Sequence, residues 1–433
     1  MCDLNQLEQA IQEMATNEEA ARFVNQVLEE DNIQFLRYIT QIWLNPKSSD
    51  KIMTNGVTLI TVALRPTVLQ PITLLAEKFF TLSEEERDQI KNAIIRGLMH
   101  DDSQTRANFA YCLSFIFKIE RTYEDKISPR FWVKPTIFDT HIVNLLNSES
   151  KYAKIGGIMA ITEILANEAI NTRNRKFIKL PQIILEISYQ AFGNMDDVDE
   201  VNLEFKSECA KCINQGFKSD IFRRILAKPE EKTRFLQSLL PNVQIPFAQL
   251  HKNLLNALKQ FICMLYDQYS ISFSAEEITP FIQQIYEDTI QPVATIQTEE
   301  FDLNKNEPFA RDVIRMWKKF ANKEYEINQS IDDEFHLNII STIAPKMDEY
   351  LFSFISTYQI EDIEDNDHSN PISFFSYQCL LSFSTVAPKI VFEHANSVYE
   401  SCLQTESRQS FFVSSVAAQI LFQIKEVPNE VLY

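Results

Sequence analysis

Two cysteines stand at a spacing used by zinc sites and redox motifs. Cys209 and Cys212 form a Cys-x-x-Cys pair, but the chain holds no second pair of this kind and no cluster of histidines. A zinc site needs two further ligands, so this pair alone does not make one. The flanking stretch from Phe205 to Phe217 has the pattern of a helix that half buries both thiols. We predict structural cysteines, with no metal and no disulfide.

Histidines and nucleophile motifs give no catalytic pattern. The six histidines lie far apart in the sequence and form no His-x-x-x-His pair, and the GxSxG, P-loop and GxGxxG patterns are absent. We therefore predict a protein that is not an enzyme and uses no cofactor.

A short acidic run is the feature best suited to binding. Five carboxylates fall within seven residues, at Glu361, Asp362, Glu364, Asp365 and Asp367. Their mutual repulsion disfavours a packed helix face, so we predict a solvated loop. Clustered carboxylates speed association with a basic partner and form charge-assisted hydrogen bonds with Arg and Lys. An ordinary charged loop without a partner is the alternative.

The composition points the same way. A formal net charge of −19 argues against nucleic acid, because proteins that bind it neutralise phosphates with Lys and Arg, and it favours basic protein partners. No stretch approaches the roughly 20 apolar residues of a membrane span, and the N-terminus does not resemble a signal peptide. Seven scattered cysteines fit a reducing compartment. We expect a soluble intracellular protein without a membrane partner.

The elements that must carry these residues are helices. Only six glycines are present, so tight β-hairpins should be scarce. Ser83-x-x-Glu86 is a capping-box signature, and it opens a predicted helix whose inner face is Ile90, Ala93, Ile94 and Leu98. After a break at Asp101–Ser103, a second helix places Ala107, Ala110, Leu113, Ile116 and Phe117 on one side. This pair of roughly 40 residues has the period of HEAT or armadillo repeats.

Similar pairs are predicted along the chain, with polar joints at Asn45–Asp50, Asn147–Tyr152, Gly193–Asp199 and Pro229–Lys232. About nine to ten such units would stack through neighbour contacts, because no unit buries its apolar face alone. The predicted fold is all-α, a right-handed α-solenoid of HEAT-type helix pairs with a concave binding surface.

Four patterns follow one another early in the chain: Leu4-x-x-Leu7-Glu8, Phe35-Leu36 leading to Leu44-Asn45-Pro46, Ile90-Lys91-Asn92, and Arg106-x-x-x-Ala110 closing at Ile119-Glu120. Together they resemble the N-terminal domain of importin-β (karyopherin-β) nuclear transport receptors. Ile314-x-x-Trp317 with Glu324 resembles a helix of that family's middle repeats, and 361–371 resembles its acidic loop. The resemblance implies N-terminal repeats at 1–120, middle repeats at 121–360, the acidic loop at 361–371, and further repeats at 372–433 that end without a polar capping repeat.

The same resemblance implies a function in protein import into the nucleus. The second helix of each pair (the B helix) in the first four repeats would bind the GTPase Ran in its GTP form. The concave face and the acidic loop would hold basic cargo or an importin-α-like adaptor until Ran displaces it. The protein would be found in cytoplasm and nucleus, including the nuclear pore. The family loop typically ends in a tryptophan before Asn-Pro, whereas Ser369 stands here after His368, and loss of an aromatic anchor would weaken adaptor binding.

The family also binds FG nucleoporins in a convex pocket between neighbouring repeats. By position the resemblance assigns that pocket to Leu185, Tyr189, Phe235 and Leu236, and ordinary core packing is the alternative. Lys232 replaces an acidic residue that the family often has nearby.

Two broader expectations complete the prediction. Receptors of this family are usually longer, so the chain resembles their N-terminal half, with a reduced cargo surface. The rival function is a HEAT scaffold or adaptor unrelated to transport, such as a phosphatase scaffold or a coat adaptor.

Overall fold

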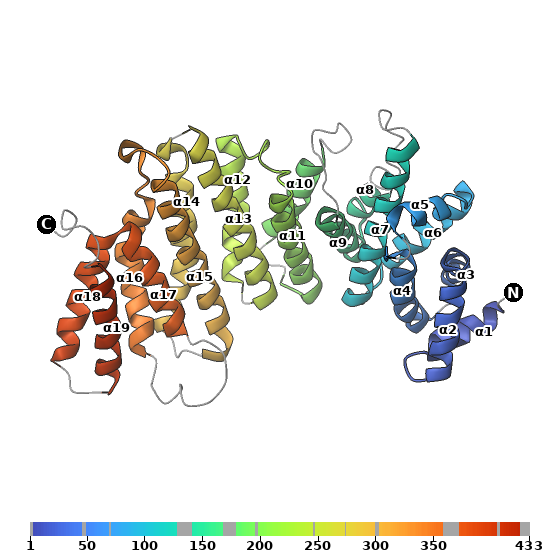
Figure 1. Cartoon of the computed structure of the whole chain (residues 1–433), viewed down its shortest axis with the longest axis horizontal. Coiled ribbons are helices and arrows are strands. Elements are labelled where there is room, and N and C mark those ends of the chain that lie inside the picture. Colours follow the sequence, from blue (N-terminus) through green and yellow to red (C-terminus); the bar gives the residue numbers. More distant parts are fainter. Residues whose placement is uncertain are drawn as a thin grey trace. The chain divides into compact units, whose positions relative to one another are not determined.

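The computed structural model describes residues 3–45, 49–68, 71–127, 141–167, 179–194, 198–245, 247–272, 274–298, 303–357, 372–404 and 408–424. Helices account for all regular structure in these ranges, which confirms the predicted all-α class (Figure 1). The chain forms two compact units, Met1–Ile221 and Phe222–Tyr433. We call them unit 1 and unit 2 and describe each by itself. The domain boundaries predicted at residues 120 and 360 stay predictions.

Unit 1 is built from successive helix pairs. Its helices are α1 (Leu4–Glu13), α2 (Glu18–Glu30), α3 (Asn32–Leu44), α4 (Asp50–Leu64), α5 (Ile72–Phe79), α6 (Glu84–Gly97), α7 (Ser103–Ile127), α8 (Val143–Leu146), α9 (Lys151–Asn167), α10 (Leu180–Gly193) and α11 (Glu200–Lys218). The second helices of the pairs, α4, α7, α9 and α11, pack side by side in that order and form one layer, which we call the B layer of unit 1 (Figure 1). The first helices α3 and α6 pack together on the other side.

Local sequence explains where these helices begin. The Ser83 hydroxyl accepts from the Glu86 N–H and the Glu86 carboxylate accepts from the Ser83 N–H, which confirms the predicted capping box of α6. All four residues predicted for the inner face of α6 are buried. At three of the predicted joints, helices end and begin as expected, at Leu44 and Asp50, Leu146 and Lys151, and Gly193 and Glu200.

A glycine lets α9 lie directly against the end of α6. A Cβ at Gly156 of α9 would lie 2.0 Å from the carbonyl oxygen of Leu98, the residue that caps the end of α6. No side chain fits at that distance, so glycine is required for α9 to pack against this backbone.

Unit 2 repeats the paired arrangement. Its helices are α12 (Pro229–Leu239), α13 (Ala248–Ser272), α14 (Thr279–Thr298), α15 (Leu303–Asn328), α16 (Ile339–Thr357), α17 (Ile372–Val386), α18 (Pro388–Leu403) and α19 (Arg408–Ile424), with short 3-10 turns η3 (Leu240–Gln244), η4 (Ala275–Glu277) and η5 (Asp333–Phe335). The layer of α12, α14, α16 and α18 packs against the layer of α13, α15, α17 and α19, which is the B layer of unit 2. The HEAT-type solenoid prediction is thereby confirmed.

One predicted joint is wrong. Pro229–Lys232 is the first turn of α12, because proline is well suited to the first helical position, where its missing N–H costs no hydrogen bond. None of the helices in the described ranges is long and apolar enough to cross a bilayer.

Candidate protein-binding face

The structure describes the four residues assigned to a nucleoporin pocket, but it does not describe the acidic run. Glu361, Asp362, Glu364, Asp365 and Asp367 lie outside the described residues. Leu185 belongs to unit 1, where it is buried, and its neighbour Tyr189 is half-buried. Phe235 and Leu236 belong to unit 2 and have no exposed surface. The nucleoporin pocket therefore stays a prediction, with Tyr189 as its most accessible member.

The Cys-x-x-Cys pair is more deeply buried than predicted. Cys209 and Cys212 of α11 have no exposed surface, and burial raises both thiol pKa values, that of Cys212 to about 12. A protonated thiol is a poor nucleophile and a poor metal ligand. Among the described residues, no three His, Cys, Asp or Glu side chains gather to hold a metal ion.

A buried arginine, Arg106, links three helices of the B layer. The side chain of Arg106 in α7 has no exposed surface, and both carboxylate oxygens of Glu204 in α11 accept from its Nη2. Its Nη1 donates to the carbonyl oxygens of His100 and Asp101, the latter at 2.8 Å. The guanidinium lies 5.0 Å from the ring centroid of Tyr152 in the intervening helix α9. Arg106 thus reaches past α9 to α11.

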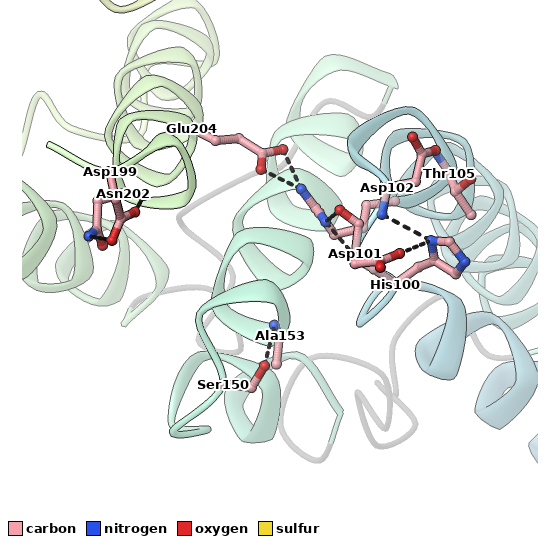
Figure 2. Close-up of polar contacts among 10 residues, drawn as sticks. His100, Asp101, Asp102, Thr105, Ser150, Ala153, Asp199, Asn202 and Glu204 are labelled. Carbon is pink, nitrogen blue, oxygen red and sulfur yellow. Dashed lines mark hydrogen bonds and ion pairs between the residues drawn. The ribbon is translucent and has the colours of Figure 1, made fainter. Parts of the chain in front are cut away.

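The N-termini of the same three helices are capped by side chains, as Figure 2 shows. Asp102 accepts from the Thr105 N–H at 2.7 Å, Ser150 from the Ala153 N–H at 3.4 Å, and Asp199 from the Asn202 N–H at 2.8 Å. The hydrogen bonds to Thr105 lower the pKa of Asp102, which therefore stays ionised. These caps satisfy N–H groups that a helix start leaves without partners, and they fix how the B layer presents its side chains.

Three glutamates gather on this layer, and we call them the glutamate cluster: Glu163 of α9 with Glu204 and Glu208 of α11. Burial raises the pKa of Glu208, and the negative charges of Glu204 and Glu163 raise it further. Lys211, whose Nζ lies 3.4 Å from Glu208 Oε2, lowers it. Burial also raises the pKa of Glu163. Arg106 pairs with Glu204 and Lys211 with Glu208, so the cluster keeps one carboxylate in excess and can bind a further cation from a partner.

Sequence reasoning found only part of this site. Arg106 belongs to a pattern quoted for the family resemblance, but its partner Glu204 lies 98 positions further on. The glutamate cluster was missed, because nothing local distinguishes its members from exposed helix glutamates. Packing of α9 on α11 brings them together.

The fold is similar to that of importin-β in several solved structures. Yeast importin-β (Kap95p) matches with a TM-score of 0.73 and 14% identity, over 100% of this chain and 48% of that chain. A Kap95p structure concerned with the switch loops of RanGDP matches at 0.69, with 12% identity over 100% and 47% of the two chains. A Kap95:Nup1 complex matches at 0.68, with 14% identity over 97% and 46%.

The structural match confirms the resemblance at the level of fold. No family model and no curated protein matches the sequence. The chain spans less than half the length of the solved structures it matches.

Proposed function

We propose that this chain is a nuclear transport receptor that binds Ran-GTP, FG nucleoporins and basic cargo or an importin-α-like adaptor. The observation that carries the proposal is the glutamate cluster on the B layer of a solenoid whose fold matches importin-β over the whole chain. One solved structure of Kap95p concerns RanGDP, and another is a complex with Nup1. We assign both kinds of partner to this chain by analogy of fold.

The mechanism is binding and release, in the cytoplasm, the nucleus and the nuclear pore. Basic side chains of Ran or cargo replace water around the glutamate cluster and form charge-assisted hydrogen bonds. A solenoid held by neighbour contacts changes its pitch with little local strain, so binding in one place biases affinity in another. Ran-GTP would lower cargo affinity in this way. The acidic run at 361–367 would add a second contact for basic partners.

The test is titration calorimetry of the purified chain with Ran loaded with GTP or GDP, at moderate salt. We expect a clear preference for the GTP form. The double variant Glu163→Gln/Glu208→Gln should weaken binding by about tenfold, because hydrogen bonds to charged groups contribute about 1.5–3 kcal/mol. The control Glu29→Gln/Glu30→Gln removes two exposed carboxylates from α2, outside the B layer, and should change affinity little.

The competing function is a HEAT scaffold or adaptor unrelated to transport. A folded chain that binds neither form of Ran would favour this scaffold and reject the receptor. Equal loss of affinity in both double variants would show a general charge effect and would remove the glutamate cluster from the binding site.

A further inference from the structure

The B layer of unit 2 carries charge of the opposite sign. Five basic residues gather on α15 and its neighbour α13, and we call them the basic ridge: Lys259, Arg315, Lys318, Lys319 and Lys323. Positions 315, 319 and 323 recur every four residues and share one face of α15. In a chain of net charge −19, such a grouping is conspicuous.

Contacts on both sides of α15 show which neighbouring helices the basic ridge reaches. Toward α17, the Arg315 guanidinium lies 4.1 Å from the ring centroid of Phe375, and Lys318 Nζ donates to Gln378 Oε1 at 2.6 Å. Toward α13, the half-buried Cys263 thiol lies near the ammonium groups of Lys319, Lys323 and Lys259. Burial raises the pKa of this thiol, and the three positive charges lower it. The ridge therefore spans the surface from α13 to α17.

Within the described ranges, few carboxylates neutralise the ridge. Asp312 lies 3.9 Å from Arg315, and Asp267 of α13, which lies 3.9 Å from Arg223, raises the pKa of Cys263 against the effect of the lysines. Glu324 is next to Lys323 in sequence, but it is fully buried and accepts from Tyr266 and from the Ile340 N–H. Among the described residues, no carboxylate lies within ion-pair distance of Lys319 or Lys323, so the positive charge of these two lysines is open to a partner.

A groove lies beside the ridge on the same layer. It has a volume of about 460 Å³ and is lined by Tyr377 of α17 and by Ser415, Ala418, Gln419, Phe422 and Gln423 of α19. The Phe422 side chain is 70% exposed. Tyr377 directly precedes Gln378, which binds the ridge residue Lys318, so α17 separates the groove from the ridge. Axes of packed helices lie about 8–10 Å apart.

We propose that the basic ridge and this groove together bind an acidic segment of another protein, in which a large apolar side chain follows the acidic run by about four to six residues. The acidic run pairs with Lys319 and Lys323, and the apolar side chain covers Phe422. An extended chain advances about 3.3 Å per residue, so this spacing crosses α17. The partner thus has the opposite charge to the basic cargo proposed above, and the inference stands whether or not that function holds.

Charge and shape favour an acidic protein segment over nucleic acid. A polyanion that extends past the ridge meets a chain of net charge −19, whereas a short acidic segment meets the ridge alone. The groove also takes an apolar side chain, which a protein segment supplies.

The test uses the full chain and fluorescence anisotropy. The probe is a labelled peptide with about six acidic residues, about five Gly/Ser residues and one Phe, and a second peptide has Ser in place of that Phe. Lys319→Glu/Lys323→Glu should weaken probe binding by about tenfold. Lys346→Glu/Lys389→Glu makes the same charge change at exposed sites on α16 and α18, in the other layer, and should weaken it by less than about twofold.

Phe422→Ser completes a double-mutant cycle with the two peptides. We expect it to weaken binding of the Phe peptide by about fivefold and to leave the Ser peptide unchanged. Circular dichroism and thermal melting check that each variant is folded. Equal losses in the two lysine pairs, or loss of the Ser peptide in Phe422→Ser, would overturn the proposal. Tighter binding of a single-stranded DNA of matched charge would assign the ridge to nucleic acid instead.

Discussion

Units 1 and 2 bury their ionisable groups in different ways. In unit 1, two buried cations meet carboxylates: Lys91 lies 3.2 Å from Glu120, and Arg106 is paired with Glu204. In unit 2, the fully buried Glu324 accepts from Tyr266 and a backbone N–H and is held by no cation in the described structure. A nearby cation works against the effect of burial on a carboxyl pKa, as Lys91 does at Glu120, whereas no cation acts on Glu324 in this way. The stability of unit 2 should therefore depend on pH up to about 7, the pKa of Glu324.

The largest expected effect is on the ion pair of unit 1. Arg106→Ala leaves the Glu204 carboxylate and two carbonyl groups without their donor, and should lower the free energy of unfolding by about 3–5 kcal/mol. Glu204→Gln should cost about 1–2 kcal/mol, because the amide still accepts a hydrogen bond and that side chain is partly exposed. Denaturant unfolding with hydrogen exchange read separately in each unit measures both. Equal loss of protection in unit 2 would contradict the assignment to unit 1.

Close packing in unit 1 gives the second effect. Gly156→Ala places a methyl group against the Leu98 carbonyl oxygen and should destabilise the protein by about 3 kcal/mol. Gly193→Ala is the matched control, because a Cβ there meets nothing within 4 Å. Thermal melting of the two variants compares them directly. Similar melting temperatures would show that α9 shifts away from α6 at little cost.

The third expected effect is a dependence of the stability of unit 2 on pH, caused by Glu324. Burial raises the pKa of Glu324 from 4.5 to about 7, while hydrogen bonds from Ile340 and Tyr266 act against it. The folded chain thus holds a proton that the unfolded chain releases between these values, so stability falls as pH rises from about 4.5 to 7, by roughly 3 kcal/mol. Glu324→Gln keeps the acceptor and removes the charge. Urea unfolding at pH 5 and pH 8 should show the variant more stable than the wild type at pH 8 only.

The smallest effect concerns Asp348 of α16 and His394 of α18. The carboxylate is fully buried, and the His394 Nδ1 lies 3.6 Å from its Oδ2. Asp348 raises the pKa of His394 above 6.5. The pair therefore stabilises the folded chain at acidic pH, and this stabilisation is lost as pH rises through the raised pKa of His394. The ring is 39% exposed, so solvent screening keeps the effect below about 1 kcal/mol. Histidine ring NMR should show the His394 pKa falling in Asp348→Asn, and an unchanged pKa would refute the coupling.

Local patterns predicted the helix pairs well. The capping box at Ser83 and the apolar face of α6 depend on residues within one helix, so both could be read from the sequence. The joint predicted at Pro229 failed because proline serves a helix start as readily as a break.

The binding surfaces depend on contacts between distant residues and were not predictable in the same way. The basic residues of α15 stand close together in sequence, but Lys259 joins them from α13, about 60 positions earlier, only through packing. Glu163 and Glu208 meet for the same reason. A helical period shows which face of one helix is apolar, and it does not show which charges meet across two helices.

The ion pair between Arg106 and Glu204 also bears on the elasticity of unit 1. Because Arg106 passes over Tyr152 of α9, the pair joins α7 to the helix after next. A change in pitch that separates α7 from α11 would stretch this contact, so the pair stiffens the array against bending in that direction. Repeats clamped in this way move as one block, and flexing is left to helix pairs joined by neighbour contacts alone.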